Sequence, residues 1–229
     1  MPKSALEVLA DEVVECKDCP RLVAHRRKMA EVKRRAYLDW EYWGKAVPPF
    51  GDPKAQMLVI GLAPAAHGGN RTGRMFTGDR SGDFLYRALY ETEFASQPTS
   101  ESRGDGLTLT GAYITAAVRC APPDNKPTLE EFQTCRKYLE RELVLLKDLK
   151  CVVALGKLAF DAYLGILRDG GVIRSRAAFS FGHNVQYRIP GAPVLIGSYH
   201  PSQQNTSTGK LTAEMLHDVF AGARAIIQR

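Results

Sequence analysis

The sequence lacks the features that mark a membrane protein or an exported protein. It contains no unbroken apolar run near the ~20 residues needed to span a bilayer. The beginning of the chain alternates acidic and apolar residues and has no apolar core of the signal-peptide kind. We therefore expect a cytoplasmic protein that makes no use of a membrane.

Internal repeats, low-complexity tracts and linkers rich in Pro, Gly and Ser are also missing. With 229 residues and a hydrophobic content of 45%, the chain is long enough to bury one sizeable core. We expect residues 1–229 to form a single domain that acts as a monomer. Residues 1–50 are expected to be a helical and basic cover over a core that begins later in the chain.

Cysteine is scarce, but four of the five cysteines follow a pattern. Cys16 and Cys19 form a C-x-x-C pair, whereas Cys120 follows a predicted strand and Cys135 lies in the predicted helix after it. Cytosolic thiols stay reduced, so disulfides are not expected. Two thiolates from one tight turn and two from distant segments suit an iron–sulfur or a zinc site, and the spacing does not choose between them. Reduced core thiols are the alternative, and Cys151 is expected to be one.

Positive charge exceeds negative charge by only 6, but it is unevenly distributed. Residues 21–35 carry one acidic residue, Glu31, and a cluster of basic ones, namely Arg21, Arg26, Arg27, Lys28, Lys33, Arg34 and Arg35. Such a cluster could neutralise several phosphates without reading base sequence. A solvated helix face is the alternative interpretation.

From residue 56 onward, short apolar strands alternate with longer helical stretches. This alternation is typical of a parallel sheet with helices on both faces. The predicted strands are 56–62, 112–118, 151–155 and 193–198, and the predicted helices are 82–94, 128–149, 156–168 and 212–227. Residues 176–189 are compatible with an added irregular hairpin. The predicted fold is thus α/β, a three-layer α/β/α sandwich around a mainly parallel four-stranded sheet.

Three of the four predicted strands are followed by unusual loops. Ligands of such sheets bind beyond the C-terminal ends of the strands, so these loops are candidates for one shared site. The first loop, 61–82, is rich in glycine and ends at a helix N-terminus, which suits close approach to an anion. It lacks the Lys-Ser/Thr pair of a phosphate-binding loop, which argues against a nucleotide hydrolase.

The other two loops contribute an amide and an imidazole. Asn125 follows the second strand in a run of prolines, where it either pairs with a base edge or forms a turn. His200 follows the last strand and begins a polar loop, where it is placed to stabilise negative charge on a leaving group. A structural histidine is the alternative for His200.

These loops resemble the motifs of the uracil-DNA glycosylase superfamily, and in particular those of its family 5, type b. Gly-Leu-Ala-Pro-Ala at 61–65 is similar to the first motif of the superfamily, and His-Pro-Ser at 200–202 is similar to the second. The extensions at 68–79 and 205–209 match family 5 more specifically. The resemblance implies an enzyme that flips uracil and related damaged bases out of DNA and excises them hydrolytically, leaving an abasic site. The alternative is a non-enzymatic nucleic-acid-binding module stabilised by a metal.

The resemblance also implies catalytic roles. Asp79 is expected to stabilise the cationic sugar or to orient water, and His200 is expected to stabilise the departing base anion. Asp79 is the expected carboxylate because residues 63–66 supply none where better-known relatives carry an acidic or polar group. Ala116 stands where related family 4 enzymes have an asparagine that reads uracil, which implies a relaxed substrate range.

Further residues are expected around the base, the DNA and a metal cluster. The expected base-binding residues are Gly61, Ala63, Asn125 and Phe76, the last with its ring stacked on the base. The expected DNA-binding residues are Arg71, Arg74, Ser202, Gln203, Asn205 and Lys210. The resemblance places a [4Fe–4S] cluster, as a structural clamp without a redox step, on Cys16, Cys19, Cys120 and Cys135.

Overall fold

A single six-stranded sheet organises the structure, a computed structural model that describes residues 2–228. The strands are β1 (Phe50–Gly51), β2 (Met57–Gly61), β3 (Ala112–Ala116), β4 (Cys151–Leu155), β5 (Val185–Tyr187) and β6 (Val194–Ser198). Their spatial order is β1-β3-β2-β4-β6-β5. The four central strands are parallel, and β1 and β5 pair antiparallel at the two edges.

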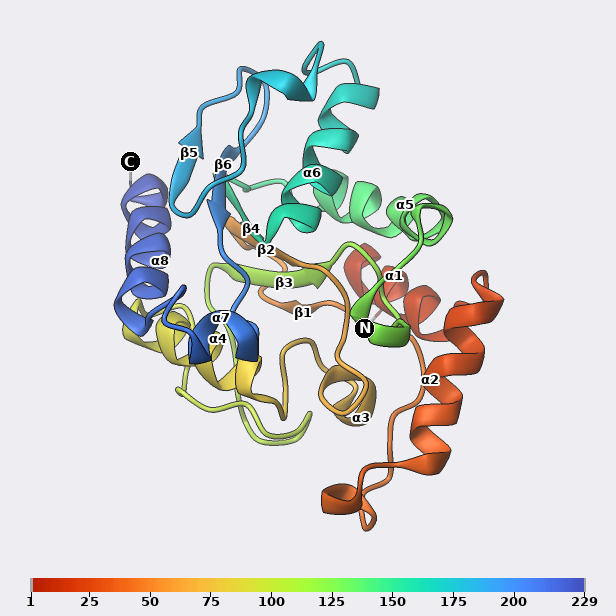
Figure 1. The fold of residues 1–229 in the computed structure, drawn as a ribbon. Coiled ribbons are helices and arrows are strands. Elements are labelled where there is room, and N and C mark those ends of the chain that lie inside the picture. Colours follow the sequence, from red (N-terminus) through yellow and green to blue (C-terminus); the bar gives the residue numbers. More distant parts are fainter. Residues whose placement is uncertain (1, 229) are drawn as a thin grey trace.

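Helices lie on both faces of this sheet. The helices are α1 (Ala5–Glu15), α2 (Pro20–Val32), α3 (Gly69–Thr72), α4 (Arg80–Glu91), α5 (Leu129–Leu145), α6 (Lys157–Asp169), α7 (Gln203–Ser207) and α8 (Ala213–Ile227). Three short 3-10 helices are η1 (Arg35–Tyr37), η2 (Pro123–Asn125) and η3 (Arg176–Ala178). Helices α4 and α8 cover one face, and α1, α5 and α6 cover the other (Figure 1).

The predicted three-layer α/β fold with a mainly parallel sheet is therefore confirmed, and each of the four predicted strands is present. The predicted strand number was too low. The two extra strands are only two and three residues long and pair at the edges, so they carry no apolar periodicity that sequence analysis could detect. Strand β5 falls within the region where the sequence is compatible with a hairpin.

The central strands are buried on both sides, which explains why they read as continuous apolar runs. Alternate residues face opposite layers because successive side chains of a strand point to opposite faces. Met57 and Val59 belong to the core under α4 and α8, whereas Leu58 and Ile60 belong to the core under α5 and α6.

The N-terminal segment packs beside this sandwich. Helix α1 contacts α5, and α2 contacts α3 (Figure 1). A third apolar cluster joins the segment to the rest of the fold, with Leu9, Val13 and Leu22 packed against Val118 and Tyr138. Among residues 2–228, no helix combines the length and the apolar character needed to cross a bilayer.

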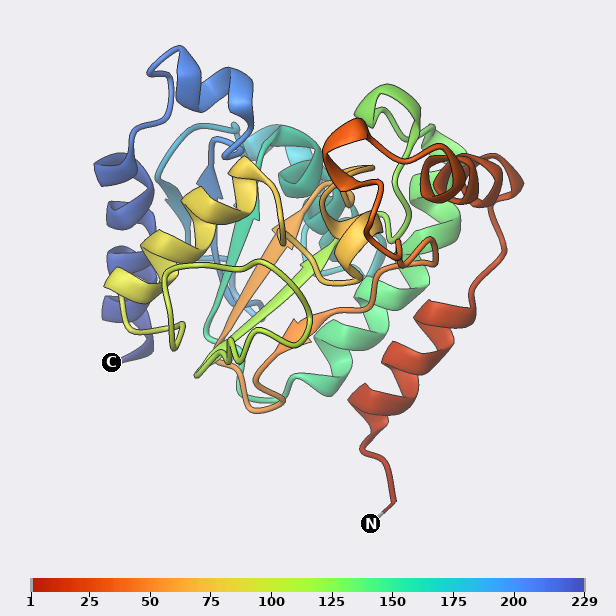
Figure 2. The same cartoon turned by 90° about the horizontal axis from the view of Figure 1, so that it is seen from below.

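The C-terminal ends of the parallel strands meet at one edge of the sheet, the upper edge in Figure 2. Helices α2, α3 and α7 and the loop that leads into α4 all gather at this edge (Figure 2). Segments that are far apart in the sequence thus come together beyond the strand ends, where a parallel sheet binds its ligands.

Candidate active site

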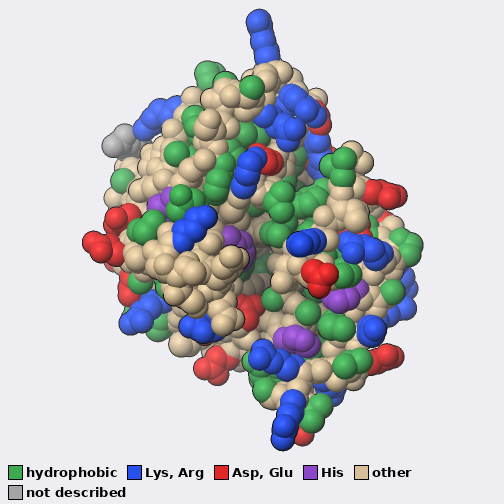
Figure 3. Space-filling view, viewed as in Figure 1, with side chains coloured by type: hydrophobic (Ala, Val, Ile, Leu, Met, Phe, Trp, Pro, Cys, Tyr) green, Lys and Arg blue, Asp and Glu red, His purple; other side chains and the backbone are tan. Residues whose placement is uncertain are grey.

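A small pocket lies where the loops after β2 and β6 meet. Its volume is about 40 Å³, and it is lined by Ala63, Pro64, Ala65, Met75, Phe76, Asp79, Ser81, Ala116 and His200. It shares five of these residues with a groove of about 850 Å³, namely Ala63, Ala65, Asp79, Ser81 and His200. The pocket therefore opens into the groove. Figure 3 shows a hollow in the middle of this face, bordered by Lys and Arg side chains.

Asp79 enters the pocket from the start of α4. It is the N-cap of this helix, and its Oδ1 accepts a hydrogen bond of 2.9 Å from the Gly82 amide. Its Oδ2 lies against Gly68, where an added Cβ would come within 1.8 Å of that oxygen, so only glycine fits. Burial raises the pKa of Asp79, while amides of α4 and the positive charge of Arg71 act in the opposite direction.

His200 enters the pocket from the opposite loop, two residues beyond β6. Burial lowers its pKa to about 4, so the imidazole is neutral at pH 7. A neutral imidazole still carries one N–H donor. The Asn205 amide donates a hydrogen bond of 2.9 Å to the carbonyl of His200 and so fixes the start of this loop.

Phe76 forms the wall between the carboxylate and the imidazole. Its ring centroid lies 5.8 Å from that of His200. Its φ of 51° falls in the left-handed region, which is rare for a bulky residue and often marks a functional site. Two glycines permit this conformation, because an added Cβ would lie 2.7 Å from the ring at Gly61 and 1.9 Å from the Phe76 carbonyl oxygen at Gly82.

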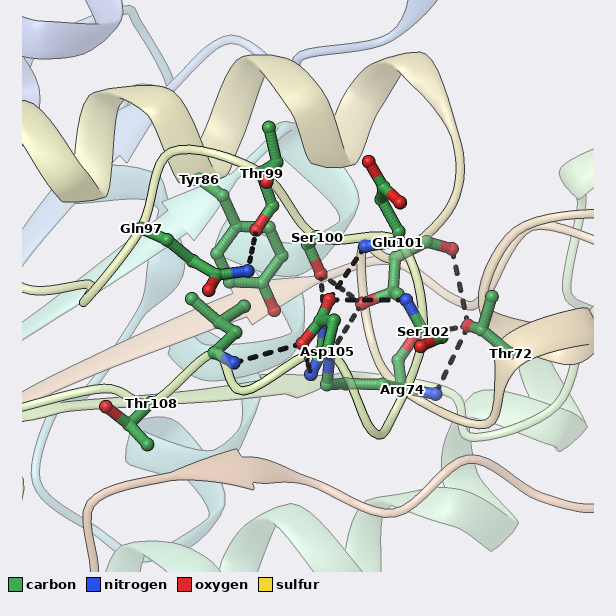
Figure 4. Close-up of polar contacts among 12 residues, drawn as sticks. Thr72, Arg74, Tyr86, Gln97, Thr99, Ser100, Glu101, Ser102, Asp105 and Thr108 are labelled. Atoms are coloured by element: carbon green, nitrogen blue, oxygen red, sulfur yellow. Dashed lines mark hydrogen bonds and ion pairs between the residues drawn. The ribbon is translucent and has the colours of Figure 1, made fainter.

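The glycine-rich loop is anchored from behind by a buried ion pair (Figure 4). The Arg74 guanidinium donates to both carboxylate oxygens of Asp105, at 2.9 and 2.5 Å, and also to Thr77 Oγ1 and Ser100 Oγ. Burial raises the pKa of Asp105, but Arg74 and the backbone amides around Asp105 outweigh that effect and hold the pKa well below its usual range. The prediction that Arg74 binds DNA was wrong, because its side chain is only 4% exposed and is already paired.

Arg71 also points into the protein, so its prediction as a DNA contact was wrong too. Only 3% of the residue is exposed. Its guanidinium donates to the carbonyls of His67 (2.8 Å) and Gly78 (2.7 Å). The rings of Tyr37 and Trp40 cover it, with centroids 3.9 and 4.1 Å from the guanidinium carbon.

The remaining predicted residues lie at increasing distances from the pocket. Ala63 lines both pocket and groove, whereas Asn125, Ser202 and Gln203 line the groove alone. Asn125 lies in η2 with a φ of 55°, a turn-like conformation that asparagine tolerates well. Lys210 is exposed and lies over the Tyr199 ring at 4.9 Å, outside the residues that line the groove.

One wall of the groove was not predicted from the sequence. Arg34, Tyr37 and His67 line it, and the Tyr42 hydroxyl is hydrogen-bonded to His67 Nδ1 at 3.0 Å. The sequence signals for this wall were Arg34 in the basic cluster and the aromatic residues that follow it, Tyr37, Trp40, Tyr42 and Trp43. They did not show which distant loop those rings would cover.

The four patterned cysteines gather at one end of the N-terminal segment. Cys120 and Cys135 belong to the third apolar cluster, and Cys16 and Cys19 pack against it. All are free thiols. Within residues 2–228, no group of three or more His, Cys, Asp or Glu side chains is arranged to hold a metal ion. Cys151 is fully buried in β4, as expected for a core thiol.

One buried cation faces these sulfurs. Arg26, of which only 2% is exposed, donates to Cys120 Sγ at 3.1 Å and to the Cys16 carbonyl at 2.9 Å. Neither acceptor is a carboxylate. A buried guanidinium beside sulfur is better compensated by thiolates than by neutral thiols, and thiolates are the metal-binding form of cysteine. Burial raises the pKa of Cys120 to about 11, and the charge of Arg26 opposes that rise. The residue types, four cysteines beside one buried cation, fit a thiolate-bound metal group.

A hollow elsewhere on the surface is less suited to chemistry. It has a volume of about 720 Å³, lies between α5 and α6, and is bordered by aliphatic residues and scattered charges such as Arg136 and Glu140. Its lining contains no imidazole, and its carboxylates, Glu140 and Asp169, lie on α5 and α6 and not beside the glycine-rich loop.

Comparison with known proteins gives matches over most of the chain. Residues 48–223 match the model of the uracil DNA glycosylase superfamily. The chain is 48% identical over 220 residues to the Type-5 uracil-DNA glycosylase of Thermus thermophilus, covering 96% of this chain and 97% of that protein. It is 46% identical over 224 residues to the Type-5 uracil-DNA glycosylase of Pyrobaculum aerophilum, covering 98% and 94%. It is 48% identical over 212 residues to the Type-5 enzyme of Mycobacterium bovis, covering 92% and 78%.

Proposed function

The chain belongs to the uracil DNA glycosylase superfamily, and on that premise we propose that it excises uracil from DNA by hydrolysing the bond between base and sugar. The observation that carries the proposal is the convergence of Phe76, Asp79 and His200 on one pocket. These residues come from loops far apart in the chain, and a metal-stabilised binding module without activity has no need to bring them together.

Cleavage of this bond leaves positive charge on the sugar and negative charge on the base. The carboxylate of Asp79 is placed to stabilise the cationic sugar or to orient the attacking water. Its position is fixed by α4 before substrate binds, and preorganised charge of this kind lowers the barrier because nothing has to reorganise during reaction.

His200 acts on the departing base. Because burial keeps its pKa at about 4, the imidazole serves near pH 7 as a neutral hydrogen-bond donor to the base anion and not as a proton source. The flipped base stacks against Phe76, whose ring lies beside the imidazole.

The apolar floor of the pocket supports a broad substrate range. Ala63, Pro64, Ala65, Met75 and Ala116 supply no side-chain amide that would read the pyrimidine edge. Asn125 lines only the outer groove, where its amide reaches a base less directly. We therefore expect excision of related deaminated or damaged bases besides uracil.

DNA is expected to lie along the groove. Basic side chains border the hollow (Figure 3), and Arg34 and Arg80 line it directly. These cations, with Ser202 and Gln203 from the same groove, are placed to contact the sugar–phosphate backbone without reading sequence.

A strand-cleavage assay tests the proposal. A labelled duplex with one uracil is incubated with the protein and then treated with alkali, which breaks the strand at abasic sites. We expect cleavage at the uracil position and none in a matched duplex with thymine. Asp79→Asn protein purified in parallel is the control for contaminating glycosylase. Intact uracil strands after prolonged incubation with folded wild-type protein would refute the proposal.

We also propose that Cys16, Cys19, Cys120 and Cys135 hold a [4Fe–4S] cluster. The gathering of the four thiols and the buried guanidinium of Arg26 support it. When bound, such a cluster would supply a structural crosslink between the N-terminal segment and the segments that carry Cys120 and Cys135.

Iron and sulfide analysis separates this cluster from zinc or from plain thiols. We expect a brown protein containing iron and acid-labile sulfide. We expect Cys16→Ala to lose colour and thermal stability to a greater extent than it loses excision rate at low temperature. A colourless wild-type protein that contains zinc alone would overturn the cluster assignment and leave the excision assignment intact.

A further inference from the structure

The N-terminal segment reaches the active site through one buried arginine. The rings of Tyr37, the last residue of η1, and of Trp40, three residues later, lie over the guanidinium of Arg71, which belongs to α3. Tyr37 also lines the groove. Arginine stacks well on aromatic faces because its planar guanidinium is weakly hydrated.

We propose that Arg71, held between Tyr37 and Trp40, is a positioning residue that fixes the carboxylate of Asp79 in the active site. The inference rests on the proposed excision activity and adds to it a part for the N-terminal segment. That segment would complete the active site as well as cover the core.

The hydrogen bonds of Arg71 end on both sides of the carboxylate. Its Nη2 donates to the carbonyl of Gly78, the residue directly before Asp79. Its Nε donates to the carbonyl of His67, the residue directly before Gly68. Gly68 is the glycine against which Asp79 Oδ2 is lodged, so one guanidinium holds both backbone segments that enclose this oxygen.

Gly78 shows how closely the backbone before Asp79 approaches the guanidinium of Arg71. Its φ is +73°, and an added Cβ would lie 2.4 Å from Arg71 Nη2. The backbone before Asp79 can approach the guanidinium this closely only without a side chain. Moving Arg71 would therefore move the backbone that carries Asp79.

Arg71 also provides positive charge near the carboxylate. The ionisable groups in the pocket and the groove around Asp79 are His200 from the β6 loop, Arg80 and Asp83 from α4, and Arg34, Tyr37 and His67 from the groove wall. Of the charged groups, Asp83 raises the pKa of Asp79 and Arg71 lowers it. The two rings keep water away from the guanidinium, and lower local dielectric strengthens its effect on the carboxylate.

Single-turnover excision measured against pH tests the inference. We expect Arg71→Gln to excise uracil about 10-fold to 100-fold more slowly at neutral pH, because misplacement of a catalytic group by about 1 Å costs that much. The acidic limb of its pH profile should move to higher pH, since Asp79 without the cation protonates more easily. Arg71→Lys keeps the charge but not the two-donor geometry, so it should slow the reaction and leave the limb near its wild-type position.

Two further variants keep the test decisive should Arg71→Gln fail to fold. Tyr37→Ala/Trp40→Ala removes only the covering rings and should move the acidic limb in the same direction, whereas Tyr37→Phe/Trp40→Phe should return the limb to its wild-type position.

Arg224 of α8 is the matched control. It also stacks on an aromatic ring, Phe94 at 4.3 Å, and donates to a backbone carbonyl. Arg224→Met should lower the melting temperature and leave the pH profile unchanged.

The outcomes separate the inference from the activity on which it rests. A folded Arg71→Gln or Tyr37→Ala/Trp40→Ala protein whose acidic limb coincides with that of the wild type would overturn the positioning role, whatever its melting temperature. Absence of excision by wild-type protein at every pH would instead refute the proposed function.

Discussion

The two loops that meet in the pocket are built very differently. The glycine-rich loop around residues 67–79 is almost wholly buried and is held by two internal arginines, Arg71 and Arg74. Half of the loop after β6, residues 199–210, is exposed, including Gln203 and Gln204 of its short helix α7.

The difference indicates that the loop carrying Asp79 is rigid and that the loop carrying His200 is easier to move. Buried, multiply bonded segments open only at high free-energy cost, whereas exposed segments with few buried contacts open at low cost. We therefore expect the carboxylate to be held in place before DNA arrives, and we expect the loop that carries the imidazole to adjust at lower free-energy cost.

The largest effect is expected from removing the negative charge of Asp79 on the rigid glycine-rich loop. Asp79→Asn should slow single-turnover excision by about 100-fold or more, because one preorganised electrostatic group contributes that much. The melting temperature should change little, since asparagine caps a helix as well as aspartate does. A near-normal rate in this variant would remove Asp79 from the mechanism.

A smaller effect is expected from weakening the ion pair between Arg74 and Asp105, which anchors the same loop. Asp105→Asn leaves the buried guanidinium of Arg74 without its counter-ion and should lower the free energy of unfolding by about 3 kcal/mol. Urea denaturation measures this. Asp161→Asn removes the carboxylate of the exposed pair with Lys157 and should cost less than about 1 kcal/mol. Equal losses in the two variants would show that the loop is not anchored by this pair.

The imidazole of His200 is expected to make the stability of the protein depend on pH. The folded protein holds the pKa of His200 near 4, below its ordinary 6.5, so the unfolded chain binds the proton more readily between these values. Stability from this group is complete above about pH 6.5 and is lost as pH falls toward 4. Thermal melting from pH 7 to 4 should show a smaller decline for His200→Asn than for the wild type.

The smallest effect concerns the anchor of the adjustable loop. Asn205→Ala removes the hydrogen bond to the His200 carbonyl and should lower the free energy of unfolding by about 1 kcal/mol, well below the loss in Asp105→Asn. Chemical denaturation measures both. A loss as large as that of Asp105→Asn would show that the two loops are equally rigid.

The four main strands and the meeting of Asp79 with His200 could be predicted because they depend on local patterns. A parallel sheet places its strand ends at one edge, so loops after different strands must converge there. The number of strands could not be predicted, since pairing at the edges is decided by segments too short to show periodicity.

The two arginines of the glycine-rich loop show where sequence analysis fails. Arginine beside glycines suggests a phosphate contact, and nothing nearby in the sequence says otherwise. Arg74 is buried because Asp105 meets it from a distant loop, and Arg71 because Tyr37 and Trp40 cover it. Each partner is set by tertiary packing that no local motif records.

The convergence of distant loops also has a consequence for synthesis. The ribosome makes Tyr37 before the segment with Asp79 and makes His200 after both, and parallel pairing joins β6 to β4 only after both strands exist. A nascent chain that has folded as far as β4 therefore holds the carboxylate of Asp79 and the ring of Phe76 but lacks the imidazole of His200. The pocket lined by Phe76, Asp79 and His200 is complete only after β6 and the loop that follows it have emerged.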